Sequence, residues 1–136
     1  EAYPDSYEAG TLNMPAIWSL KNSIEYIDSH INEIHKTEKE LLDTTIRELS
    51  SIDKVEIYNS EAERVPTFCF NIKGVPSNEV IKYLSDNDIC VRGGIHCAIL
   101  AHKTIGTVET GAVRVSLNAF NTKEEIYKFI KVIKEL

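Results

Sequence analysis

The sequence has no apolar run long enough to cross a bilayer, and no secretory signal opens it. It also has no arginine-rich stripe, and its net charge of −6 argues against a nucleic-acid partner. Its three cysteines, an odd number, do not make a disulfide framework and fit a reducing compartment better. We therefore expect a cytoplasmic protein that binds neither nucleic acid nor membrane.

Internal repeats, low-complexity segments and interior linkers are absent as well. The 136 residues, 43% of them hydrophobic and 26% charged, suit one compact globular domain. The first residue is Glu1 rather than methionine, so we expect a processed protein or an excised piece of a longer one. Residues 1–13 show no clear periodicity of apolar residues. They are predicted to precede a domain of residues 14–136.

The periodicity of apolar residues predicts helices first and strands later. Asn13 is expected to cap a helix with Pro15 in its first turn, and Asp28-Ser29-His30 to separate this helix from a longer one. After Ser50 the pattern predicts strands at 55–58, 67–72, 89–92 and 112–117, a helix at 77–84 begun by Ser77, and a last helix capped by Asn121 or Thr122. This order predicts an α+β fold, with a small, largely antiparallel sheet covered by helices.

Residues 91–98, Val-Arg-Gly-Gly-Ile-His-Cys-Ala, are the most informative stretch. The segment between Arg92 and Cys97 contains two glycines and a histidine, so the thiol of Cys97 is expected on a mobile loop close to the positive charge of Arg92. A thiol attacks only as its thiolate, which nearby positive charge favours. Cys97 is thus a candidate nucleophile. The alternative, that Cys97 is a small buried hydrophobe, stays open from these residues alone.

Arg114 is expected in mid-strand, with Ser116 on its face and Val113, Val115 and Leu117 on the other. An unpaired arginine is costly to bury there, and a guanidinium suits a bidentate grip on a carboxylate. An ordinary strand arginine that reaches solvent or pairs with a surface glutamate is equally compatible with the pattern. Arg92, expected at the end of its strand, carries the same ambiguity.

Four other features of the sequence support weaker interpretations. The spacing of Cys90, His96, Cys97 and His102 matches no common zinc pattern, so we predict no metal site. A protease dyad of His96 and Cys97 is disfavoured because catalytic pairs are usually distant in sequence. Cys69 is predicted to lie in the core. The polar stretch 104–111 is expected to enclose Cys97 in a long irregular loop.

Four motifs in order resemble the C-terminal small domain of class V aminotransferase-fold enzymes, most closely the cysteine desulfurase and selenocysteine lyase branch. They run from Tyr7 to Thr11, from Arg92 to Cys97, from Gly111 to Ser116 and from Asn121 to Glu125. The resemblance covers nearly the whole chain. It implies the C-terminal domain of a fold-type I pyridoxal-phosphate enzyme that acts as a dimer.

The resemblance also implies a role for five residues. Cys97 would take sulfur from L-cysteine as a persulfide and leave alanine. Arg114 would hold the substrate carboxylate with Arg92 beside it, and Gly10 and Thr11 would reach a cofactor phosphate in the partner subunit. The substrate would be cysteine or selenocysteine, and a sulfur-acceptor protein is a further expected partner. His96 receives no role.

The chain departs from the family pattern at two points. The lysine that forms the Schiff base belongs to the family's large domain, and Lys103, although it follows a histidine, does not lie in that lysine motif. We therefore expect this piece alone neither to hold pyridoxal phosphate nor to desulfurate cysteine. Gly93 stands where many relatives carry threonine, and is expected to loosen the arm.

Two further hypotheses remain open. The chain could belong to a class V aminotransferase or lyase in which Cys97 is incidental and Arg114 still matters. It could instead be a stand-alone binding or redox-sensing module with Cys97 as the sensor thiol.

Overall fold

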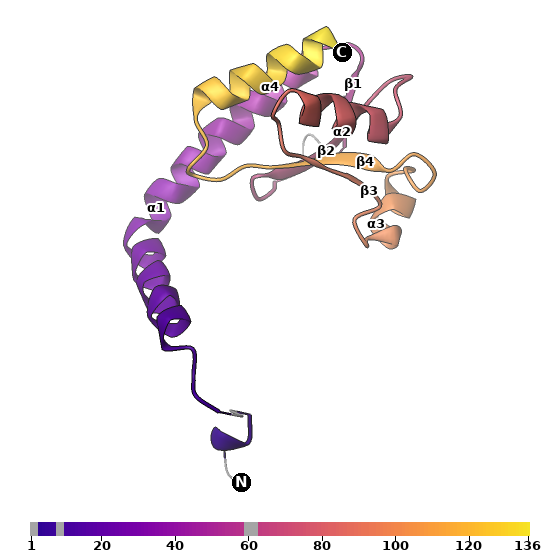
Figure 1. Ribbon diagram of the computed structural model, residues 1–136. Helices are drawn as coiled ribbons and strands as arrows, with labels where there is room; N and C mark the ends of the chain where they lie inside the picture. The colour runs from indigo at the N-terminus through magenta and orange to yellow at the C-terminus, as the bar shows by residue number, and fades with distance from the viewer. Residues whose placement is uncertain (1–2, 8–9, 59–62) are drawn as a thin grey trace. The chain divides into compact units, whose positions relative to one another are not determined.

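The computed structural model describes residues 3–7, 10–58 and 63–136 (Figure 1). Glu8 and Ala9 of the first family-like motif lie outside these residues. The chain divides into two compact units, Glu1–Ile34 and His35–Leu136. Its elements are a 3-10 helix (Asp5–Tyr7), α1 (Met14–Ser50), β1 (Val55–Ile57), β2 (Thr67–Ile72), α2 (Ser77–Asp86), β3 (Arg92–Gly94), α3 (Ile99–Thr104), β4 (Ala112–Ser116) and α4 (Lys123–Glu135).

Helix α1 runs without interruption for 37 residues, so the break predicted at residues 28–30 is wrong. The polar side chains there bond back to the preceding helical turn instead of ending the helix. Ser29 Oγ donates to the carbonyl of Glu25 at 2.8 Å, and the ring of His30 stacks on Tyr26 with centroids 4.3 Å apart. Serine and histidine without a neighbouring glycine or proline can therefore continue a helix.

The first unit contains the beginning of α1. Asn13 caps the helix as predicted, since its Oδ1 accepts a hydrogen bond from the Ala16 N–H at 3.1 Å. The predicted apolar positions of this part are exposed to between 46% and 61%: Ile17, Leu20, Ile24 and Ile27.

Among the described residues, no helix combines the length and the apolar character that a membrane span requires.

The second unit contains a four-stranded sheet in the order β1-β2-β4-β3, with each neighbouring pair antiparallel. The predicted α+β class and antiparallel sheet are confirmed. The third strand starts at Arg92 rather than at Ile89, so the predicted range was wrong. Asp88 takes a left-handed φ of 59°, and the Ile89 N–H bonds to the Leu84 carbonyl at 2.9 Å. Ile89 therefore closes α2 and cannot join the sheet ladder.

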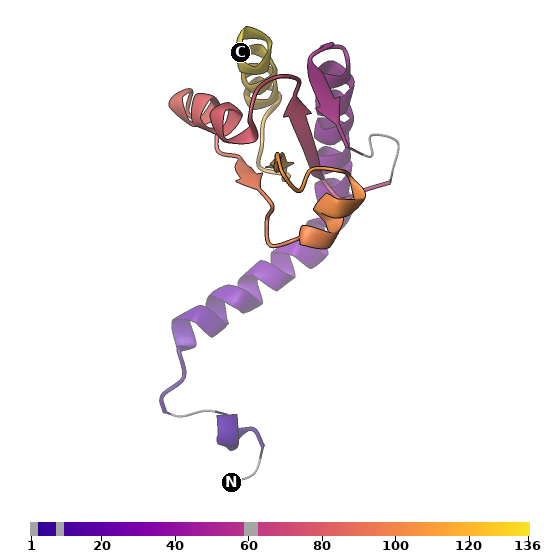
Figure 2. The same ribbon diagram turned by 90° about the vertical axis from the view of Figure 1, so that its right-hand side faces the viewer.

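The core lies on one face of this sheet. Inward residues of β2 and β4 pack against α2, α4 and the C-terminal part of α1, which follow one another across that face (Figure 2). The largest fully buried side chains include Phe70, Leu49, Leu84 and Ile133, one from each of four elements. The opposite face carries the alternate, half-buried or exposed residues Thr67, Cys69, Arg114 and Ser116. The faces predicted for strand 112–117 are thus confirmed.

Close contacts fix two segments near the end of the sheet, the turn before β4 and the start of α2. A Cβ on Gly111, whose φ is 64°, would lie 2.9 Å from the Cα of Gly94, so only glycine fits. Ser77 does not cap α2 as predicted, because Pro76 holds that position; Ser77 Oγ donates to the Thr110 carbonyl at 2.6 Å. Thr122 caps α4, one of the two residues predicted to do so, and forms a capping box with Glu125.

Gly93 has a packing role that the sequence did not indicate. A Cβ at this position would lie 1.7 Å from Cδ1 of Ile81 on α2. We expect Gly93→Ala to destabilise the protein by about 1–3 kcal/mol, because a well-packed contact must open. Combining it with Ile81→Ala should cost less than the sum of the two single changes, measured by urea unfolding. Additive effects would show that the two residues do not compete for space.

Candidate active site

Two arginines face each other across neighbouring strands. Arg92 on β3 pairs in register with Arg114 on β4, and Arg114 pairs on its other side with Cys69 on β2. Residues directly opposite in antiparallel strands present their side chains to the same face, here the face away from the core. Two guanidinium groups therefore share one patch of surface, an arrangement that like charge destabilises unless an anion lies between them.

Arg114 is half-buried, and its Nε is a buried donor with no hydrogen-bond partner among the described residues. Within residues 3–7, 10–58 and 63–136, no ion pair involves Arg92 or Arg114. Among the described residues, neither arginine is paired with a surface glutamate. The other form of the alternative, an arginine that reaches solvent, describes Arg92, which is exposed. An unsatisfied, positively charged donor group of this kind is suited to binding a carboxylate.

Cys69 lies beside Arg114 and not in the core, so that prediction was wrong. Its side chain is half-buried on the face that carries the arginines, while its neighbours Phe68 and Phe70 fill the core. Burial raises the pKa of the Cys69 thiol, and the charge of Arg114 opposes this only in part. Cys69 is thus a neutral thiol at neutral pH, unsuited to act as a nucleophile.

Cys97 occupies a tight turn three residues beyond β3. The Ala98 N–H donates to the Ile95 carbonyl at 2.9 Å, and the two central residues, His96 and Cys97, have φ values of 54° and 58°. Positive φ at both central positions is the pattern of a type I′ turn, which normally selects glycine or asparagine. Each non-glycine residue held this way costs of the order of 1–3 kcal/mol. The thiol is exposed and free.

The side chain of His96 connects this turn to its surroundings. Its Nε2 lies 3.1 Å from the Arg92 carbonyl oxygen, and its ring lies 5.5 Å from that of His102. Burial, together with the charges of Arg114 and Arg92, lowers the pKa of the imidazole, although the bond to the Arg92 carbonyl opposes the shift. The lowered pKa favours the uncharged imidazole at neutral pH.

The segment after Cys97 is not the irregular loop that we predicted. Residues 99–104 form α3, which ends in a turn tied back by a hydrogen bond from the Thr107 N–H to the His102 carbonyl at 2.9 Å. His102 is 3% exposed and its Nδ1 lies 2.7 Å from Oγ1 of Thr107, itself 2% exposed. Sequence reasoning missed this buried pair, because six helical residues show too little periodicity.

The structure places two of the five predicted site residues, Arg92 and Arg114, opposite each other, and it places Cys97 in the turn that follows β3. The other two predicted site residues, Gly10 and Thr11, belong to the first compact unit. Both are exposed. Gly10 has a φ of 137°, and apart from its chain neighbours no described residue has a heavy atom within 4 Å of where its Cβ would be. Their backbone is open to a ligand, and their contact with a phosphate stays a prediction.

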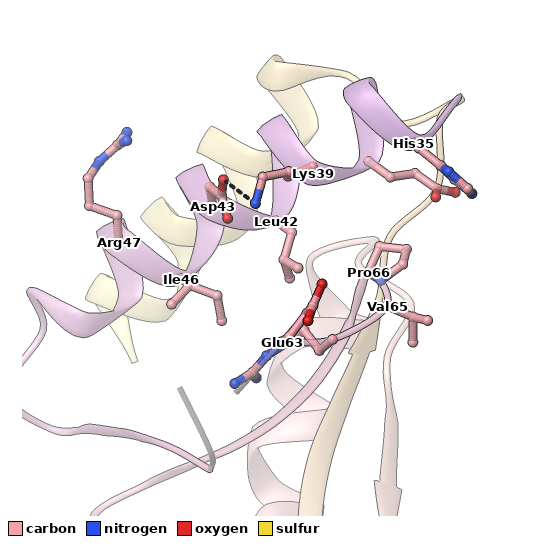
Figure 3. A pocket seen from close by; sticks show the side chains of 11 residues that line it. His35, Lys39, Leu42, Asp43, Ile46, Arg47, Glu63, Val65 and Pro66 are labelled. Atoms are coloured by element: carbon pink, nitrogen blue, oxygen red, sulfur yellow. Dashed lines mark ion pairs between the residues drawn. The ribbon is translucent and has the colours of Figure 1, made fainter. Parts of the chain in front are cut away.

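A hollow of about 700 Å³ lies elsewhere, between α1 and residues 63–66 (Figure 3). Its wall combines apolar Leu42 and Ile46 with the ion pair of Lys39 and Asp43, whose Nζ–Oδ2 distance is 3.6 Å. Neither the arginine pair nor Cys97 lines it. The hollow is therefore separate from the candidate site.

Comparison with known proteins identifies the family to which the chain belongs. Residues 1–129 match the family model of aminotransferase class-V. A probable cysteine desulfurase of Methanothermobacter thermautotrophicus is 36% identical over 139 residues, which cover all of this chain and 35% of that protein. A probable cysteine desulfurase of Borreliella burgdorferi is 33% identical, and the match covers 98% of this chain and 33% of the relative.

Solved structures give the same picture. The apo structure of a cysteine desulfurase from Thermococcus onnurineus superposes with a TM-score of 0.84 at 32% identity, covering 97% of this chain and 33% of that one. The cysteine desulfurase CsdA of Escherichia coli, at 21% identity and a TM-score of 0.83, shares the fold. The chain spans about a third of the length of these relatives.

Proposed function

Because the chain belongs to the aminotransferase class V family, we propose that it is the C-terminal part of a pyridoxal-phosphate-dependent cysteine desulfurase. The observation that carries the proposal is the cross-strand pair of Arg92 and Arg114, without carboxylate partners among the described residues, together with the exposed thiol of Cys97 in the turn that follows the strand of Arg92. A transaminase needs an arginine for its substrate carboxylate. It does not need a thiol in the strained turn that follows the strand of Arg92.

In this proposal Arg114 holds the carboxylate of substrate cysteine, and Arg92 adds positive charge on the same face. The thiolate of Cys97 attacks the substrate sulfur. A sulfur–sulfur bond forms, the carbon–sulfur bond of the substrate breaks, and the carbon skeleton takes up a proton and leaves as alanine. Cys97 then carries a persulfide. The exposure of Cys97 supports transfer of this sulfur to an acceptor protein.

Pyridoxal phosphate, when bound, supplies the electron-accepting ring that makes cleavage of the carbon–sulfur bond feasible. Among the residues of this chain, Gly10 and Thr11 are suited to contact its phosphate, because Gly10 leaves the backbone open to a close approach. We further propose that they do so in the partner subunit of a homodimer, and that the enzyme works in the cytoplasm.

The full-length protein tests the proposal directly. With L-cysteine and a thiol reductant, it should release alanine and sulfide in equal amounts. Amino-group transfer to a keto acid without sulfide would favour the aminotransferase alternative and contradict the proposal. Selenocysteine in place of cysteine establishes which of the two substrates the protein prefers.

A further inference from the structure

The turn that carries Cys97 is strained and needs support from outside itself. We propose that the buried imidazole of His102 is a positioning residue that holds the left-handed turn at His96 and Cys97. It thereby fixes where the Cys97 thiol stands relative to Arg92 and Arg114. The inference rests on the proposed function only in taking Cys97 as the nucleophile. Sulfur transfer as described above does not use His102.

The contacts of His102 are those of a rigid support. Its Nδ1 is engaged by the Thr107 hydroxyl at 2.7 Å, and its backbone carbonyl accepts from the Thr107 N–H at 2.9 Å. Thr107 is in turn fixed to the start of β4, because its carbonyl accepts from the Gly111 N–H at 2.8 Å. Both side chains are almost fully buried. The ring of His102 is therefore held from two sides, and it contacts the turn through His96.

His96 transmits this support to Cys97. Its ring lies against His102, with planes inclined at 41°, and its Nε2 is 3.1 Å from the Arg92 carbonyl oxygen. The side chain is thus placed between α3 and β3. If the ring of His96 no longer rested on His102, the two left-handed residues could relax toward negative φ, which L-residues prefer. The thiol would then move with the backbone, away from its place near the arginines.

Alkylation of the full-length protein measures this placement without relying on turnover. Iodoacetate carries a carboxylate and iodoacetamide does not, so a thiol near Arg92 and Arg114 should react faster with iodoacetate, relative to iodoacetamide, than a distant thiol does. Cys90, also exposed and free, lies two residues before Arg92 and outside the turn, so it is the internal reference for changes that do not come from the turn; peptide mass spectrometry follows both sites. In His102→Gln we expect the iodoacetate preference of Cys97 to fall at least about threefold, and that of Cys90 to stay constant.

Matched variants separate positioning from general stability. Thr107→Val removes the hydroxyl that engages His102 and should lower the preference in the same direction, whereas Thr107→Ser should keep it. His35→Gln changes an exposed imidazole on α1 and should have no effect. If His102→Gln does not fold, the two Thr107 variants decide the question alone.

The possible outcomes distinguish this inference from the proposed function. Loss of the preference at Cys97 in a protein that never releases alanine would support the positioning role and contradict the desulfurase. Loss of the preference together with a proportional loss of turnover would support both. An unchanged preference at Cys97 in a variant with a lower melting temperature would overturn the inference, since His102 would then serve stability only.

Discussion

Replacing Cys97 with serine should lower the release of alanine from cysteine by the full-length protein at least about a thousandfold. A serine hydroxyl stays protonated at neutral pH and is a far weaker nucleophile than a thiolate, so no persulfide can form. The side chain is exposed and almost unchanged in size, and the turn is set by its backbone. The melting temperature and the absorption of bound cofactor should therefore remain as in the wild type.

Cys90→Ser is the matched control for this experiment. Cys90 is also exposed and free, but it precedes β3 and lies outside the turn. The control should retain full activity. Wild-type turnover in Cys97→Ser would show that another group accepts the sulfur; Cys69 would be the first to examine, although its raised pKa makes it a poor nucleophile.

Much of the fold follows from patterns within single segments. The strand at residues 67–72 alternates without exception between core and open face, and its bounds were predicted correctly. The capping box of α4 is likewise a local signal within four residues. Errors arose where tertiary contacts decide the outcome. Ile89 looks like a strand residue, yet it closes α2 because Asp88 adopts a left-handed conformation.

The candidate site was only partly predictable, for a similar reason. Side-chain chemistry and the family resemblance together identified Arg92, Arg114 and Cys97 as candidates. The register that sets the two arginines opposite each other is a property of the sheet. The turn at Cys97 has no glycine at its two centres, so no turn signal in the sequence announces it. The support from His102 and Thr107 depends on burial, which six residues of helix cannot reveal.

Arg114→Met should separate binding from stability. It removes the charge and the forked donors but keeps much of the hydrocarbon stem. We expect kcat/KM for cysteine to fall about a hundred- to a thousandfold, since two charge-assisted hydrogen bonds to the carboxylate are lost. Without substrate, the free energy of unfolding should be unchanged or higher, because an unpartnered buried Nε and a repulsive cross-strand pair both disappear.

The test is decisive because a binding role lowers kcat/KM without lowering the free energy of unfolding. Arg47→Met removes an exposed arginine from α1, where Arg47 pairs with Glu48 at 3.4 Å, and should change neither quantity measurably. A large loss of unfolding free energy in Arg114→Met would show that Arg114 supports the sheet. Steady-state kinetics and urea unfolding of the same preparations distinguish the cases. In a binding residue of this kind, the unpaired guanidinium lowers the stability of the free protein. Its favourable hydrogen bonds form only when the substrate carboxylate is bound.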